Sequence, residues 1–188
     1  IWEVKKILVI CPLSVIPTWE KEIKKTTKYN FYPLVGTTGD RQNLLCSGED
    51  GVYAINYEGL KWVFGEMVQS VKAGEGEGKR FELCQDWFDE FEKQGFDGLI
   101  CDEIHKFKNR TSVQTQVGSA LSKICKKVIL MTGTPILKNE LDLLKMNDVF
   151  LARMEILFVA LKFYFEIVHF LVRFAVGNEL SRSYLPIQ

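Results

Sequence analysis

The sequence predicts an α/β protein built on a parallel sheet that is flanked by helices. Five short apolar runs alternate with longer segments whose apolar residues recur at helical spacing, which is typical of strand–helix–strand units. The runs are rich in Val, Ile and Leu and carry few charges, as expected of strands buried on both faces. The expected strands lie at 6–11, 31–36, 51–56, 97–102 and 127–132. Helices on both faces of this sheet would give three layers.

The segments between the expected strands carry helix and loop signals. Pro12 ends the first apolar run, and Ser14 is placed to cap the helix expected over 15–28, in which Trp19 lies on the apolar face. Residues 70–79 are rich in glycine and charge and are expected to form a loop between two helical stretches. Two further helices are expected later in the chain, at 113–123 and 139–150.

Composition limits the classes of protein that the chain can belong to. Its 188 residues suit one domain, and its 24 lysines and arginines equal its 24 aspartates and glutamates, so any contact with nucleic acid must be local. The five cysteines are odd in number and contain no C-x-x-C pair, which argues against a disulfide framework and a zinc site. We therefore expect an intracellular protein, cytoplasmic in a prokaryotic or viral-host context and nuclear in a eukaryote.

Residues 151–174 form a strongly apolar stretch near the C-terminus. Within it, Lys162, Glu166, His169 and Arg173 follow one another at steps of four, three and four, which places them on one stripe of a helix. A membrane span does not usually carry such a stripe at its centre. The pattern favours a helix that is buried on a broad face, with a membrane-surface or partner-binding helix as the alternative.

The most informative polar residues are Asp102 and Glu103, two adjacent carboxylates at the end of an apolar strand. Open α/β sheets place their ligand sites at such strand ends. An aspartate there can hold Mg²⁺ through its water shell, and the next glutamate can orient and deprotonate an attacking water. The alternative interpretation is an acidic strand end that faces solvent.

Polar residues also follow the other expected strands. Thr132, Gly133 and Thr134 end the last strand. The hydroxyls of the two threonines, together with the glycine, can bond the carboxylates of a neighbouring strand, although an ordinary turn would look the same. Ser14 follows the first strand, where exposed backbone N–H groups can bind a phosphate. Asn56, at the end of the third strand, could cap a helix or contact a nucleic-acid backbone.

Four motifs in this order resemble the first RecA-like lobe of Swi/Snf-type superfamily-two ATPases. The matching segments are C-P-L-S-x-x-x-x-W at 11–19, N-Y-E at 56–58, the DEAH-like box D-E-x-H at 102–105, and T-G-T-P-I at 132–136. The resemblance covers about residues 5–145, and its specificity comes from the order and spacing of the motifs.

The resemblance implies that the chain uses ATP and Mg²⁺. It implies that Asp102 coordinates the Mg²⁺ of bound ATP and that Glu103 is the catalytic base. His105 would relay between the ATP site and the nucleic-acid side. The motif with Thr132, Gly133 and Thr134 would couple hydrolysis to binding of the nucleic-acid strand.

The resemblance also implies a partner and a fold. Ser14, Asn56 and Tyr57 would lie on a face that follows a DNA backbone, without reading its bases. The expected fold is a three-layer RecA-like sheet that is incomplete. Residues 1–150 would form a partial ATP-binding lobe, and residues 151–188 a helical C-terminal extension that the resemblance does not reach.

One family motif has no match. No G-x-G-K-T loop occurs, and the similar segment Gly76-Glu77-Gly78-Lys79-Arg80 is rejected because an arginine stands where a Mg²⁺-binding hydroxyl is needed. We therefore expect part of an ATP-dependent nucleic-acid motor that needs a second motor lobe or another chain and that does not span a membrane. The alternatives are a non-catalytic remnant that binds nucleic acid or protein, and a membrane-surface protein.

Overall fold

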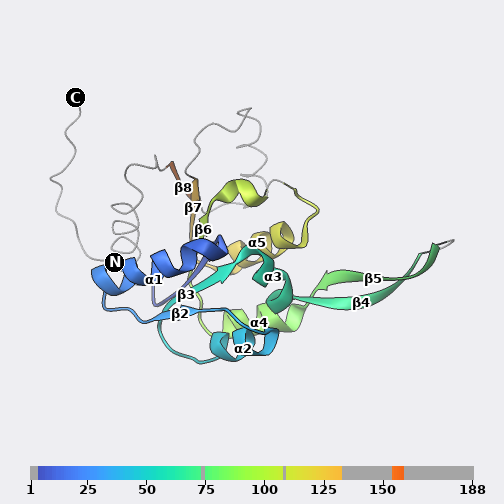
Figure 1. Cartoon of the computed structure of the whole chain (residues 1–188), viewed down its shortest axis with the longest axis horizontal. Coiled ribbons are helices and arrows are strands. Elements are labelled where there is room, and N and C mark those ends of the chain that lie inside the picture. The colour runs from blue at the N-terminus through green and yellow to red at the C-terminus, as the bar shows by residue number, and fades with distance from the viewer. Residues whose placement is uncertain (1–3, 73–74, 108, 133–153, 159–188) are drawn as a thin grey trace.

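A six-stranded parallel sheet forms the centre of the molecule. The computed structural model describes residues 4–72, 75–107, 109–132 and 154–158 (Figure 1). The strands are arranged in the order β2-β3-β1-β6-β7-β8, and every neighbouring pair is parallel. Their bounds are β1 (Lys6–Cys11), β2 (Phe31–Pro33), β3 (Gly51–Asn56), β6 (Gly98–Asp102), β7 (Lys127–Thr132) and β8 (Met154–Phe158). The predicted α/β class with a parallel sheet is confirmed.

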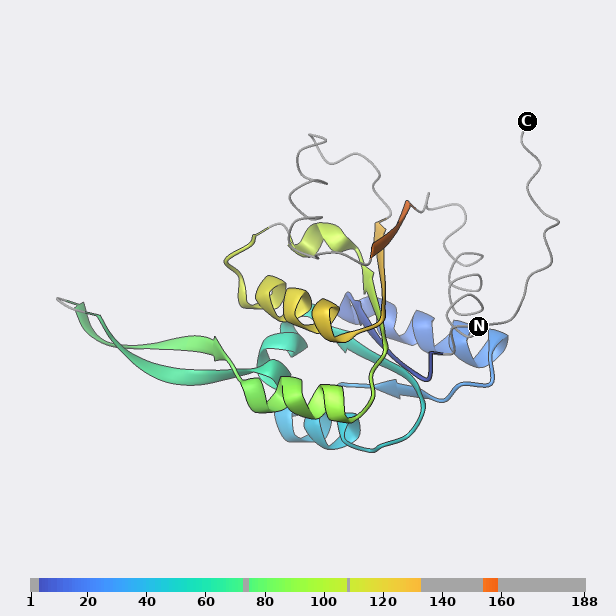
Figure 2. The ribbon, with the colours of Figure 1, turned by 180° about the vertical axis from the view of Figure 1, so that it is seen from behind.

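Helices cover both faces of the sheet, and strand residues alternate between two cores. One core contains Leu8 and Ile10 of β1 together with apolar residues of four helices. These helices are α2 (Thr38–Leu45), α3 (Tyr57–Phe64), α4 (Gln85–Lys93) and α5 (Val113–Ile124), of which α4 and α5 face the viewer in Figure 2. The other core contains Ile7 and Val9, packed against α1 (Ile16–Thr26) on the opposite face. Alternation of side chains along each strand therefore produces the three layers.

The start of α1 differs from the expectation. Ser14 lies in a short 3₁₀ turn, η1 (Leu13–Val15), and the residue that precedes the helix, Val15, makes no side-chain capping bond. The predicted cap by Ser14 is therefore wrong. Pro17 in the first turn favours helix initiation without a cap, because its fixed φ suits a helix and its missing N–H is not needed there.

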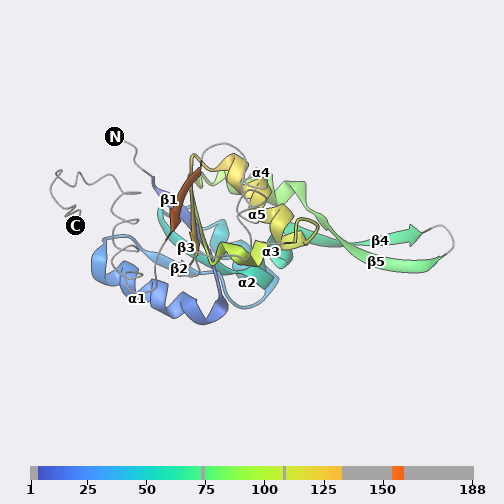
Figure 3. The ribbon, with the colours of Figure 1, turned by 90° about the horizontal axis from the view of Figure 1, so that it is seen from above.

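The segment expected to be a loop at 70–79 belongs to a β-hairpin. β4 (Gly65–Lys72) and β5 (Glu75–Leu83) pair antiparallel as a separate two-stranded sheet that extends away from the body (Figure 3). Composition misled the prediction here. The two strands of a hairpin satisfy their backbone groups by pairing with each other and do not need alternating apolar residues.

The expected helix over 151–174 is wrong at its beginning. Met154–Phe158 forms strand β8, which pairs in parallel with β7. A short apolar run fits a buried strand and a buried helix equally well, so periodicity could not decide between them. The rest of 151–174 and the helix expected at 139–150 lie outside the described residues. Among those residues, no helix is both long and apolar enough to cross a bilayer.

Candidate functional site

The carboxyl ends of four strands meet in one row at one edge of the sheet. Cys11 at the end of β1 pairs with Asn56 at the end of β3, and Asp102 at the end of β6 pairs with Met131 in β7. On the other side of β1, Ile10 pairs with Cys101, which brings Cys11 level with Asp102. The chain runs from β1 to β2 and β3 on one side and only later to β6 on the other. The strand order therefore reverses at β1, and ligand sites of open α/β sheets form beside the carboxyl ends of strands at such a reversal.

Asp102 is almost fully buried at this edge, with 2% of its surface exposed. The indole N–H of Trp19 donates a hydrogen bond to its Oδ2, with 3.3 Å between the two heavy atoms. The position of Trp19 on the apolar face of α1 predicts a core residue, and the sequence gives no sign of this contact. A buried carboxylate is retained at a strand end only if polar partners stabilise it, and the indole is one such partner.

Glu103 follows directly, with an unusual backbone conformation. Its φ is +60°, in the left-handed region that non-glycine residues rarely adopt. Its Oε2 lies 3.0 Å from Nδ1 of His105, and both side chains are about 30% exposed. Neither atom has a well-aligned hydrogen bond to a described residue, although both are buried from solvent. Strained backbone and poorly satisfied polar atoms cluster at functional sites, which makes this pair a candidate for proton transfer.

Tyr57 reaches the same strand end from α3. Its hydroxyl donates to the backbone oxygen of Asp102, and the backbone oxygen of Glu103 lies 3.2 Å away as a second acceptor. The ring is 6% exposed and packs edge-on against Phe107 at a centroid distance of 5.0 Å. Burial raises the pKa of Tyr57 well above its ordinary value, so the hydroxyl keeps its proton.

Asn56 is also buried, and its side chain is occupied by other residues. Its Oδ1 accepts from Nη1 of Arg41 at 3.0 Å, and its Nδ2 donates to Oε2 of Glu58 at 3.0 Å. Asn56 precedes α3, but its side chain does not cap the helix. Arg41 can approach because Gly59 has no side chain; a Cβ there would overlap the guanidinium. Arg41 comes from α2, and no sequence signal pointed to it.

A surface groove of about 460 Å³ opens beside these residues. We call it the strand-end groove; it is lined by Pro12, Leu13, Ser14, Tyr57, Glu58 and Lys106. Ser14 and Lys106 are exposed, so the groove offers a hydroxyl and an ammonium group to a ligand. Two of the three predicted nucleic-acid contacts, Ser14 and Tyr57, therefore meet at one surface. Asn56 is buried and is not among the lining residues.

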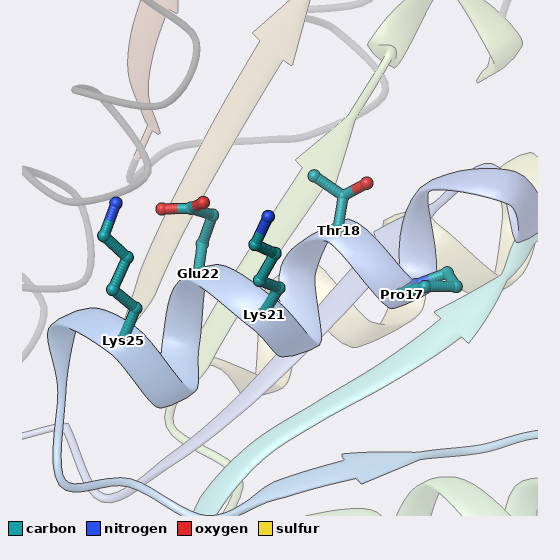
Figure 4. A pocket seen from close by; sticks show the side chains of 5 residues that line it. All are labelled: Pro17, Thr18, Lys21, Glu22 and Lys25. Atoms are coloured by element: carbon teal, nitrogen blue, oxygen red, sulfur yellow. The ribbon is translucent and has the colours of Figure 1, made fainter.

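A second pocket lies along one side of α1. It is lined by Pro17, Thr18, Lys21, Glu22 and Lys25, and the last four raise their side chains from the same side of the helix (Figure 4). Two ammonium groups there could bind phosphate, although the carboxylate between them opposes it.

The placement of the last motif is only partly described. Thr132 ends β7 and directly follows Met131, the partner of Asp102. Gly133 and Thr134 lie outside the described residues. Within the described part of the chain, no three His, Cys, Asp or Glu side chains form a metal cluster. A single carboxylate such as Asp102 still fits Mg²⁺, which commonly binds through one or two carboxylates, water and the phosphates of a substrate.

The chain matches one protein family and several curated proteins. The model of the SNF2-related domain family matches residues 1–158. Protein CHROMATIN REMODELING 25 of Arabidopsis thaliana is 30% identical over 149 residues, which cover 74% of this chain and 13% of that protein. The Transcriptional regulator ATRX homolog of Caenorhabditis elegans is 29% identical, over 73% and 11% respectively. The DNA repair and recombination protein RAD54 of Oryza sativa subsp. japonica is 31% identical, over 74% and 12%. The chain thus spans about a tenth of the length of these curated relatives.

Proposed function

The chain belongs to the SNF2-related domain family, and we propose that it forms part of an ATP-dependent nucleic-acid motor of the Swi/Snf type. Members of this ATPase family use ATP and Mg²⁺ in general. The observation that carries the proposal for this chain is the row of strand ends, which brings the segments after β1, β3 and β6 to one edge. Residues 1–150 would act as a partial ATP-binding lobe, to which β8 (Met154–Phe158) adds the edge strand, and the residues after 158 would form an extension.

Asp102 and Glu103 would supply the hydrolytic chemistry. Bound ATP would bring the Mg²⁺ that Asp102 holds through water, and this ion would neutralise developing charge on the phosphates. Trp19 fixes the Asp102 carboxylate in place. Glu103 would orient the attacking water and take its proton, while Nδ1 of His105, 3.0 Å away, would receive or return that proton. Thr132, Gly133 and Thr134 would couple this site to the bound strand.

The strand-end groove would hold the backbone of DNA. Ser14 can donate to a phosphate and Lys106 can neutralise it, whereas Glu58 in the same groove opposes it and keeps the affinity low. Asn56 could reach a phosphate only if its bonds to Arg41 and Glu58 opened. The names of the relatives refer to chromatin remodelling and to DNA repair and recombination, so an intracellular location, nuclear in a eukaryotic cell, is part of the proposal.

The second candidate function is a non-catalytic remnant that binds nucleic acid or a protein partner. The Asp102–Glu103 pair favours the motor, since a purely binding remnant has no need of both carboxylates. In the motor, a second lobe or another chain would supply the remaining groups for hydrolysis. Both candidates share the strand-end groove, so binding of DNA tests them together.

Fluorescence anisotropy with a short labelled DNA duplex of mixed sequence, at several salt concentrations, tests the groove. We expect weak binding that falls steeply with salt, and Lys106→Ala should reduce the slope of log K against log salt by about 1. Lys93→Ala is the control, because Lys93 is exposed and ends α4, shortly before β6 begins, and so lies near the amino ends of the strands. No binding at low salt, or an unchanged slope in Lys106→Ala, would contradict the proposal.

A further inference from the structure

Tyr57 connects the strand-end groove with the acidic strand end. Tyr57 is one of the residues that line the groove, together with Ser14 and Lys106, although only 6% of its surface is exposed. Its hydroxyl, at the other end of the ring, donates to the backbone oxygen of Asp102 and lies 3.2 Å from that of Glu103. A single rigid ring therefore touches the surface proposed for DNA and the backbone that carries both carboxylates.

The backbone that Tyr57 holds needs support. Glu103 has a φ of +60°, a conformation that a residue with a side chain keeps only when its surroundings impose it. The Tyr57 hydroxyl bonds to the peptide groups on both sides of this conformation, because the acceptors are the oxygens of Asp102 and Glu103. The indole of Trp19 holds the Asp102 carboxylate separately. Tyr57 thus holds the backbone of Asp102 and Glu103, whereas Trp19 holds the side chain of Asp102.

A second contact links the Tyr57 ring to the same segment. The ring packs edge-on against Phe107, which ends the 3₁₀ turn η2 (Ile104–Phe107) directly after Glu103. Phe107 is buried, so it cannot move independently of the turn. A displacement of the Tyr57 ring would therefore act on Glu103 in two ways. The Tyr57 hydroxyl would move relative to the carbonyl oxygens that it bonds, and Phe107 would move the turn η2 that follows Glu103.

We propose that Tyr57 is a positioning residue through which a nucleic-acid backbone in the strand-end groove adjusts the placement of Asp102 and Glu103. This inference rests on the proposed function of the groove. A phosphate seated between Ser14 and Lys106 would contact the small exposed part of Tyr57 and displace the residue, and its ring would move with it. The hydroxyl at its far end would then change the length and angle of its bond, on which a hydrogen bond depends steeply. The acidic pair would respond although no nucleic acid touches it.

The indole N–H of Trp19 provides a reporter of this response. Trp19 is 1% exposed, so DNA cannot contact it directly, and its N–H points at Asp102. In ¹H–¹⁵N NMR spectra of the 188-residue chain, Trp19→Phe identifies its signal among those of the four tryptophans. We expect titration with the short DNA duplex to shift this signal in the wild-type chain.

Tyr57→Phe is the decisive variant, because it keeps the ring in the groove and removes only the hydroxyl. Its own affinity, measured in the anisotropy assay, sets the duplex concentration that gives the same bound fraction as in the wild type, and at that fraction it should lose most of the shift at the Trp19 signal. Tyr53→Phe is the matched control. Tyr53 is a buried tyrosine of β3 whose hydroxyl donates to the backbone of Glu49 and contacts Ser47, far from the acidic pair, so its loss should leave the shift intact.

The outcomes separate this inference from the proposed function. If Tyr57→Phe keeps the full shift, DNA acts on Trp19 by another route, such as the lysines of α1, and the inference is overturned. If the wild-type chain binds DNA without any shift of the Trp19 signal, the inference is wrong, but the proposed DNA-binding role of the groove is kept. This result needs only the wild-type chain, so it is decisive even if Tyr57→Phe does not fold. If the wild-type chain binds no DNA at low salt, the proposed groove fails, and the inference fails with it.

Discussion

Replacing Trp19 with phenylalanine is expected to lower the free energy of unfolding by about 2–3 kcal/mol. Two effects add up. The indole N–H bonds to a buried carboxylate, and such bonds to charged groups contribute about 1.5–3 kcal/mol. The distance of 3.3 Å is long for an N–H···O bond, so we place its contribution at the lower end of that energy range. Removing part of a fully buried indole adds roughly 1 kcal/mol of lost transfer and cavity energy.

A double-mutant cycle with Asp102→Asn separates the two effects. An uncharged amide oxygen accepts a weaker bond, so Trp19→Phe should cost about 1 kcal/mol less in the Asp102→Asn background than in the wild type. Urea unfolding followed by far-ultraviolet circular dichroism gives all four free energies, and it does not depend on the fluorescence of the substituted tryptophan. The m-values should stay equal across the set, which shows that the extent of unfolding is the same.

Trp87→Phe is the control for this cycle. Trp87 lies on α4 and packs against the core on the other face of the sheet. Trp87→Phe should lower the free energy of unfolding by the same amount in the wild type and in the Asp102→Asn background. If the Trp19 cycle is also additive to within about 0.5 kcal/mol, the indole does not stabilise the carboxylate, and Trp19 is only a core residue.

Two further predictions concern the helices. Lys21→Ala combined with Lys25→Ala should reduce the salt slope of DNA binding by up to about 2 if the α1 pocket contacts phosphates, whereas Lys24→Ala, which removes an already paired lysine, should change it less. Thr37→Ala should destabilise α2 by about 1 kcal/mol in urea unfolding, because it breaks the capping box with Asp40. Hydrogen bonds from Thr37 lower the pKa of Asp40, so this stabilisation is present above the ordinary carboxyl pKa and is lost as the pH falls through the lowered value. An equal cost of Thr37→Ala at neutral and strongly acid pH would contradict it.

The sequence located the buried strands well where apolar runs had clear ends. The runs at 6–11, 51–56 and 127–132 have the bounds that the structure gives to β1, β3 and β7. Each is a short apolar run that contains Val and Ile and ends before a proline or at a polar residue, and the alternation of such runs with amphipathic segments favours strands buried on both faces. The hairpin β4–β5 lacks this constraint. It is held by pairing within an exposed unit, and pairing leaves little trace in composition.

The sequence also located the ends of the strands as the candidate site, but it could not predict how these ends connect. That Asp102 and Glu103 follow a buried strand is a local property, visible in the order of residues. The contacts of Trp19 and Tyr57 with them join residues 83 and 45 positions apart, so they depend on the register of β1, β3 and β6. A slip of one residue would turn every side chain of a strand to the opposite face.

The register explains why two aromatic residues, each expected to have an unrelated role, converge on one acidic pair. Trp19 lies on α1, which follows β1 and packs on one face of the sheet, whereas Tyr57 begins α3, which follows β3 and packs on the other. Because β1 lies between β3 and β6, both segments start at the same edge, and Asp102 is reached from both faces. A strand end held from two sides, with a left-handed Glu103 beside it, can respond to a ligand on either face. In the proposed coupling, the parallel sheet would itself provide the link between the strand-end groove and the acidic pair, without a dedicated moving part.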